Sequence, residues 1–96
     1  MTMAKVEKLH FDQRGETLWI AELADGAFYR IDLYPAVSGA HRASYELTFF
    51  FRRADDWANK GWRYQKVCVS SHKSLELAVR RAERFRRELI SLAEAA

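Results

Sequence analysis

The chain has 96 residues, of which 49% are hydrophobic and 14% aromatic, and it carries a formal net charge of +3. This length fits one domain, and the apolar content excludes a disordered chain. No apolar run approaches the roughly 18 residues of a membrane span, and no N-terminal apolar stretch resembles a signal peptide. The single cysteine, Cys68, excludes an internal disulfide. We therefore expect one cytoplasmic domain over residues 1–96.

Five segments have the composition or alternation of β-strands, with turn residues between them. The expected strands are residues 6–11, 17–23, 28–34, 45–53 and 63–70. Turn chemistry at residues 12–15 separates the first two, and the first strand is short and charged enough for a sheet edge. Asp25-Gly26 is the clearest hairpin signal, because both residues tolerate the positive φ of a type I′ turn. The pattern predicts an antiparallel meander sheet of four to five strands.

Residues 74–93 have the one-sided pattern of a helix that packs on a core. Apolar residues recur on one side of the helix, at Leu75, Ala78, Val79, Ala82, Phe85, Leu89 and Ala93, with Ile90 and Leu92 at its edges. Ser71 or Ser74 is the expected N-cap, and Glu76 suits the helix dipole. The chain therefore predicts an α+β fold in which one C-terminal helix packs across one face of the sheet.

A single helix leaves the second face of the sheet without a covering layer. If Tyr29, Ile31 and Leu47 point at the helix, strand alternation turns a set of aromatic and basic side chains outward. The candidate binding residues on that outward face are Phe28, Arg30, Tyr34, Phe50, Arg52, Trp62, Tyr64 and Lys66, with Asp32 and Thr48 among them.

Three interpretations of this face remain open. Interleaved rings and cations are typical of proteins that bind single-stranded DNA or RNA, since bases stack on rings while cations follow the phosphates. The same residue types are enriched at interfaces, so the face also suits a homodimer. A bulge could instead turn part of a strand, which would place some of these rings in the core. The order of strands followed by a helix is similar in topology to the single-strand-binding Pur-repeat and Whirly folds, without a shared sequence motif.

The basic residues are concentrated in the second half of the chain. Residues 1–38 carry four Lys or Arg against six acids, whereas residues 39–96 carry twelve against seven. On the helix, Glu76 with Arg80 and Glu83 with Arg87 have the spacing of i,i+4 ion pairs. Arg80, Arg81 and Arg84 are the candidates for a phosphate-facing patch. Arg86 lies within the apolar stripe, where it either extends its stem toward water or pairs with an acid.

No residue set indicates catalysis or cofactor binding. His10, His41 and His72 have no metal-ligand spacing with each other or with Cys68, and the four glycines occur in four separate turns. In the Ser70-Ser71-His72 run, helix capping explains the serines better than a catalytic pair, and Cys68 is expected to be an inert strand residue. We expect a non-enzymatic binding protein without a metal, cofactor or small-molecule substrate. Its candidate partners are single-stranded DNA or RNA, or a second copy.

Overall fold

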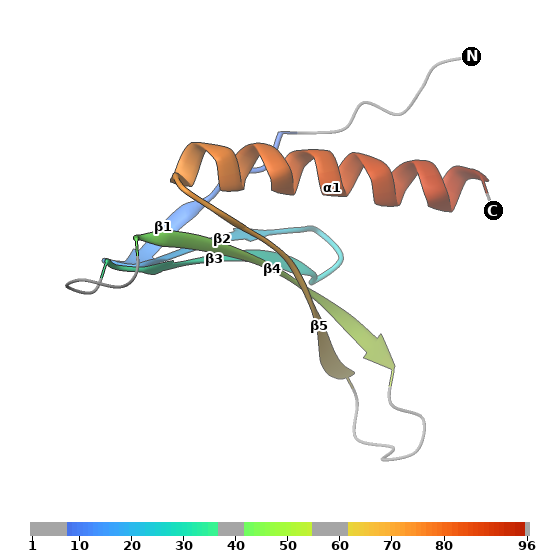
Figure 1. The fold of residues 1–96 in the computed structure, drawn as a ribbon. Helices are drawn as coiled ribbons and strands as arrows, with labels where there is room; N and C mark the ends of the chain where they lie inside the picture. The colour runs from blue at the N-terminus through green and yellow to red at the C-terminus, as the bar shows by residue number, and fades with distance from the viewer. Residues whose placement is uncertain (1–7, 37–41, 55–61, 96) are drawn as a thin grey trace.

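The protein forms a five-stranded antiparallel meander with one C-terminal helix, as the sequence predicts (Figure 1). The computed structural model describes residues 8–36, 42–54 and 62–95, without the side chains of residues 52–54 and 62–64. The strand order in the sheet is β1-β2-β3-β4-β5. The elements are β1 (Asp12–Gly15), β2 (Leu18–Glu22), β3 (Phe28–Tyr34), β4 (Ser44–Ala54), β5 (Trp62–His72) and α1 (Leu75–Ala95).

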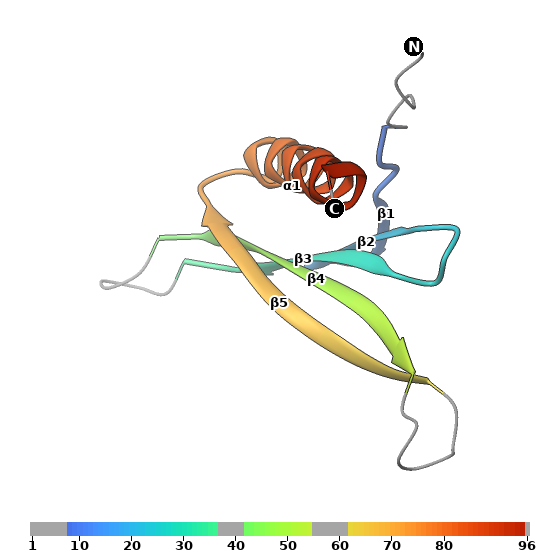
Figure 2. The same cartoon turned by 90° about the vertical axis from the view of Figure 1, so that its right-hand side faces the viewer.

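The helix α1 lies over one face of the sheet, and the part of the chain that the structure describes places no element over the other face (Figures 1 and 2). The far ends of β4 and β5 bend away from α1, toward the side without a helix (Figure 1). Within the described residues, no helix is long and apolar enough to cross a membrane. The fold therefore consists of two layers, with one sheet face left open.

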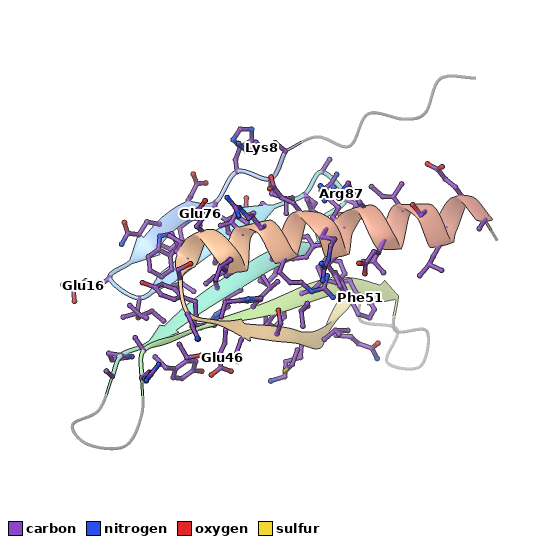
Figure 3. All side chains as sticks on the ribbon, turned by 45° about the horizontal axis from the view of Figure 1, so that its top comes forward. Lys8, Glu16, Glu46, Phe51, Glu76 and Arg87 are labelled. Atoms are coloured by element: carbon purple, nitrogen blue, oxygen red, sulfur yellow. The ribbon has the colours of Figure 1, made fainter. Side chains whose placement is uncertain are left out.

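The core lies between the sheet and the first half of α1. Tyr29, Ile31 and Leu47 have less than 2% of their surface exposed, and they face Ala78 and Ala82 of the helix. Side chains from the upper side of the sheet gather beneath α1 in Figure 3. Small residues on the helix let it approach the sheet closely, so that the large residues of β3 and β4 fill the space between the two layers.

The helix begins as expected and extends past its support. Ser74 is the N-cap, because its hydroxyl accepts a hydrogen bond from the Leu77 amide at 3.2 Å. Toward the C-terminus the apolar stripe loses its cover: Leu89 is 37% exposed and Leu92 is 69% exposed. The predicted stripe is therefore buried in the first turns and uncovered in the last.

The prediction for the first strand is wrong in its position. Residues 8–11 are not in a strand, and β1 is formed by Asp12–Gly15, which we expected to be a turn. Leu9 is buried against the helix instead, with 6% of its surface exposed. Pairing with β2 therefore overrides the low strand propensity of Asp and Gly. The edge position is confirmed, since among the described strands β1 pairs only with β2 and all four of its residues are exposed.

The hairpin at Asp25-Gly26 is present, but its turn is not the expected type. The Gly26 amide donates to the Leu23 carbonyl at 3.1 Å, and the Leu23 amide donates to the Ala27 carbonyl at 2.9 Å. These bonds define a three-residue loop that ends on Gly26 with φ of 91°, instead of a two-residue type I′ turn. The Asp25 carboxylate accepts from the Ala27 amide at 3.0 Å and fixes the loop.

A bulge in β5 changes which residues face the helix. Leu47 pairs with Ser70 while the next residue, Thr48, pairs with Cys68, so Val69 is the extra residue on β5. Before the bulge, Lys66 and Cys68 face away from the helix. After the bulge, Ser70 and His72 face the helix.

Candidate partner-binding face

The open face is the side of the sheet opposite α1, and the strand register defines it. Residues directly opposite each other on neighbouring strands share a face. The register produces three parallel rows on this face: Glu22, Phe28, Phe50 and Lys66; Ile20, Arg30, Thr48 and Cys68; Leu18, Asp32, Glu46 and Ser71. Tyr34 lies beyond the third row, opposite Ser44.

Two phenylalanines form the aromatic centre of the open face. Phe28 and Phe50 are cross-strand partners whose rings stack with centroids 4.7 Å apart and planes 12° from parallel. Both residues are half-buried, although no helix lies over them. Because each ring uses one side on the other, the pair does not form two separate flat surfaces.

The charged groups of the open face are largely paired with one another. Nε and Nη2 of Arg30 both donate hydrogen bonds to the Asp32 carboxylate, at 2.9–3.0 Å. The hydrogen bond to Asp32 raises the pKa of Arg30, so this cation keeps its charge. Arg14 lies 3.4 Å from Glu22 and 3.9 Å from Asp12. Lys66 and Glu46 are exposed and have no ion-pair partner among the described residues.

The predicted binding residues do share one face. Phe28, Arg30, Phe50 and Lys66 lie within the rows above, and Tyr34 is 54% exposed beside them. Arg52 pairs with Tyr64, and Ala54 with Trp62, so these positions continue the same face toward the ends of β4 and β5. The side chains of Arg52, Trp62 and Tyr64 lie outside the described residues.

Several residues of the open face, among them Leu18, Ile20 and Cys68, were missed from the sequence. Leu18 and Ile20 lie on it beside Asp32 and Arg30 and add an aliphatic margin to the rings. The alternation of Leu18, Ile20 and Glu22 along one strand, together with the hairpin to Phe28, contained the signal that could have placed them. Cys68 was expected to be inert within a strand, yet its thiol is exposed on this face.

One contact that the sequence did not favour is present on the helix side. The Ser70 hydroxyl oxygen lies 2.6 Å from His72 Nε2, because residues two apart on a strand point the same way. Burial, together with the positive charge of Arg81, lowers the pKa of His72. No acid contacts His72 among the hydrogen bonds and ion pairs of the described residues, and no group of three or more metal-ligating side chains occurs there.

The comparisons with known proteins add no relative. No family model matches the chain, and no curated protein or solved structure shows significant similarity to it. Function must therefore be argued from the face itself.

Proposed function

We propose that the protein is a non-enzymatic binding protein whose open face is its docking surface, and that a second copy of the chain occupies it. The observation that carries this proposal is the distribution of charge around the ring pair. Lys66 lies in the row of Phe28 and Phe50, and the acid of that row, Glu22, is paired with Arg14 at 3.4 Å. Glu46 lies two rows further along the strands, beside Asp32, which is paired with Arg30. Among the described residues, the charge left without an ion-pair partner is therefore basic at one end of the face and acidic at the other.

Such a face is complementary to itself. A two-fold axis that reverses the strand direction sets the Lys66 end of one copy over the Glu46 end of the other, and it does so twice. The axis then passes near the middle row, and the Phe28–Phe50 pair of each copy is enclosed within the interface, where aromatic side chains contribute to interface stability. The Arg30–Asp32 pair enters already hydrogen-bonded, which limits the cost of removing it from water.

Binding of single-stranded DNA or RNA is the second candidate, and one feature favours it. Phe28, Phe50 and Lys66 adjoin in a single row, so a base could stack at the end of the ring pair beside a cation that contacts phosphate. The acids Glu22, Asp32 and Glu46 on the same face oppose a polyanion, and Arg30 is committed to Asp32. These acids make the second copy the better-supported partner.

Sedimentation equilibrium with charge-reversed variants tests the dimer. Lys66→Glu alone and Glu46→Lys alone should each weaken association by about tenfold, since each places like charges opposite one another. The combination Lys66→Glu with Glu46→Lys should recover most of the loss, because the two ends simply exchange sign. Glu94→Lys, on the exposed end of α1, is the matched control and should leave association unchanged.

Two outcomes contradict the dimer. One is a monomer of 11.2 kDa that persists at millimolar concentration. The other is a dimer in which Cys68 reacts with iodoacetamide as fast as in dilute monomer, because that thiol lies within the proposed interface. Tight binding of an oligonucleotide at low salt would support the nucleic acid candidate instead. In that case Phe50→Ala should weaken the binding and leave the slope of log K against log salt unchanged.

A further inference from the structure

A groove of about 400 Å³ runs along the side of α1 next to the end of β5. Its walls carry an unusual concentration of guanidinium groups. The lining residues are His72, Leu77, Arg80, Arg81, Glu83, Arg84 and Arg87. Arg80 and Arg87 are separated by about two helical turns, so the cations follow the length of the groove. Glu76 and Arg87, labelled in Figure 3, mark the two ends of this stretch of α1.

The acids near the groove do not satisfy these cations. Arg80 donates a hydrogen bond to the Glu76 carboxylate at 2.6 Å, which confirms the predicted pair. Glu88 forms ion pairs with two arginines, at 3.5 Å from Arg84 and 3.8 Å from Arg81. Both distances are too long for good hydrogen bonds. The predicted Glu83–Arg87 pair does not form, and Arg87 has no ion-pair partner within the described part of the chain.

Arg81 shows most clearly that a partner is missing. Its guanidinium lies over the Phe85 ring, 5.6 Å from the centroid, and only 23% of its side chain is exposed. Its Nη1 is buried and donates no hydrogen bond within the described residues, since the Glu88 carboxylate is too distant at 3.8 Å. A buried charged donor without an acceptor is costly, so an anion that reaches this nitrogen would gain a charge-assisted hydrogen bond.

His72 adds an imidazole donor or acceptor at the β5 end of the groove. Its ring contacts the Ser70 hydroxyl, faces Arg81 from α1 and lies opposite Tyr45 of β4 in the register. The arginines along the helix and the imidazole at the strand end therefore converge on one concave surface. Arginine presents planar, paired donors that match the oxygens of a phosphate group.

We propose that this groove binds a ligand bearing a terminal phosphate group, with Arg81, Arg84 and Arg87 as its principal contacts. Among the described residues of the lining, Leu77 is the one apolar side chain and the His72 imidazole the one ring, and the remaining apolar surface belongs to the arginine stems, so recognition is of the phosphate and not of an attached base or chain. The site belongs to the helix layer and faces away from the open face. It therefore neither requires nor excludes the proposed dimer.

The test uses pyrophosphate as the probe, with the His72 ring protons followed by NMR at low salt. Binding should raise the pKa of His72, because the ligand's negative charge offsets the effect of Arg81. His10, which is exposed outside the groove, is the internal reference, and pyrophosphate should leave its ring-proton signals unchanged. Arg84→Gln and Arg87→Gln should each weaken binding about tenfold, as expected for loss of one charge-assisted contact, while Arg42→Gln should leave it unchanged.

Comparison of phosphorylated and unphosphorylated probes separates the sources of the phosphate. AMP should compete with pyrophosphate and adenosine should not; an oligonucleotide with a 5′-phosphate should compete better than the same sequence with a 5′-hydroxyl. Equal competition by the two oligonucleotides would mean that the chain phosphates are bound and would overturn the terminal-phosphate proposal. An unchanged pKa of His72 at about 10 mM pyrophosphate would also overturn the proposal. So would a loss of affinity on Arg42→Gln as large as that on Arg84→Gln, because it would indicate general charge attraction.

Discussion

The two faces of the sheet carry similar side chains and have different surroundings. On the helix side, the Tyr29 ring lies 4.6 Å from Phe49, and both contact Phe85 of α1. On the open face, Phe28 and Phe50 stack at a similar distance, on the side of the sheet that α1 does not cover (Figure 1). Residue type alone does not tell a core from a docking surface. The position of one helix decides which rings are structural and which are available to a partner.

The largest expected difference between the faces concerns cavity formation. Leu47 is 1% exposed beneath the helix, so Leu47→Ala should lower the free energy of unfolding by about 2–5 kcal/mol. Thr48→Ala, one residue along β4 on the open face, is the matched control and should cost less than about 1 kcal/mol. Urea denaturation monitored by circular dichroism measures both. Equal losses would mean that the two faces are not distinguished as described.

The next test compares two positions on the helix. Phe85 packs edge-on against Tyr29 and Phe49 but remains half-buried, so Phe85→Ala should cost about 2–3 kcal/mol, below the value for a fully buried ring. Leu92→Ala, near the uncovered end, should change stability by less than about 0.5 kcal/mol. A loss below about 1 kcal/mol for Phe85→Ala, measured by thermal unfolding, would contradict the docking of α1 on the sheet.

A third test uses the buried hydroxyl of the helix side. Burial raises the pKa of Tyr29 to about 12, against a partly opposing effect of Arg86, and the hydroxyl has no hydrogen-bond partner among the residues that the structure describes. The unfolded chain releases this proton near pH 10, so the stability that Tyr29 contributes is complete below that pH and is lost as the pH rises to about 12.

Tyr29→Phe should therefore reduce the alkaline loss of stability and should be neutral or stabilising by up to about 1 kcal/mol at pH 7, since it removes an unpaired polar group. Tyr34→Phe on the open face is the control and should leave the alkaline transition unchanged. Denaturant titrations at pH 7 and at a series of values up to pH 12 provide the comparison. A wild-type alkaline loss that persists in Tyr29→Phe would contradict the assignment.

The smallest expected effect comes from the paired ions of the open face. Arg30→Ala should destabilise the monomer by about 0.5–1 kcal/mol, because the pair with Asp32 is well formed but partly exposed. A double-mutant cycle with Asp32→Ala should return a coupling energy of similar size that falls with added salt. A coupling several times larger, insensitive to salt, would mean that the open face is buried under the conditions of the experiment.

Sequence reasoning recovered the strands from β2 to β5 and the helix because their periodicity is regular. Residues 28–34 alternate without interruption, and the register of β3 with its neighbours follows from that alternation. The first strand was misplaced because the pairing of Asp12–Gly15 depends on β2 and not on local propensity. The type of the turn before Ala27 was also not recoverable, since two loops of different length share the Asp25-Gly26 signal.

The candidate sites were predictable to different degrees. Alternation alone placed Phe28, Arg30 and Phe50 on one face, but the pairing of Arg30 with Asp32 is a matter of side-chain geometry. Arg86 shows the same limit. Its Nε is buried without a hydrogen bond and no ion pair forms within the described residues, which fits a buried stem and not a partner acid. The arginine groove required both α1 and the end of β5 in place, since His72 is distant in sequence from Arg84 and Arg87.

The extra residue at Val69 decides which of the last residues of β5 face the helix. Continuous alternation from Cys68 would pair Val69 with Leu47 and would turn both Ser70 and His72 to the open face. Because the bulge leaves Val69 unpaired, Ser70 lies opposite Leu47 and His72 opposite Tyr45, on the helix side. The imidazole of the arginine groove is therefore a product of this bulge, and the alternation of the strand alone would have placed it on the other layer.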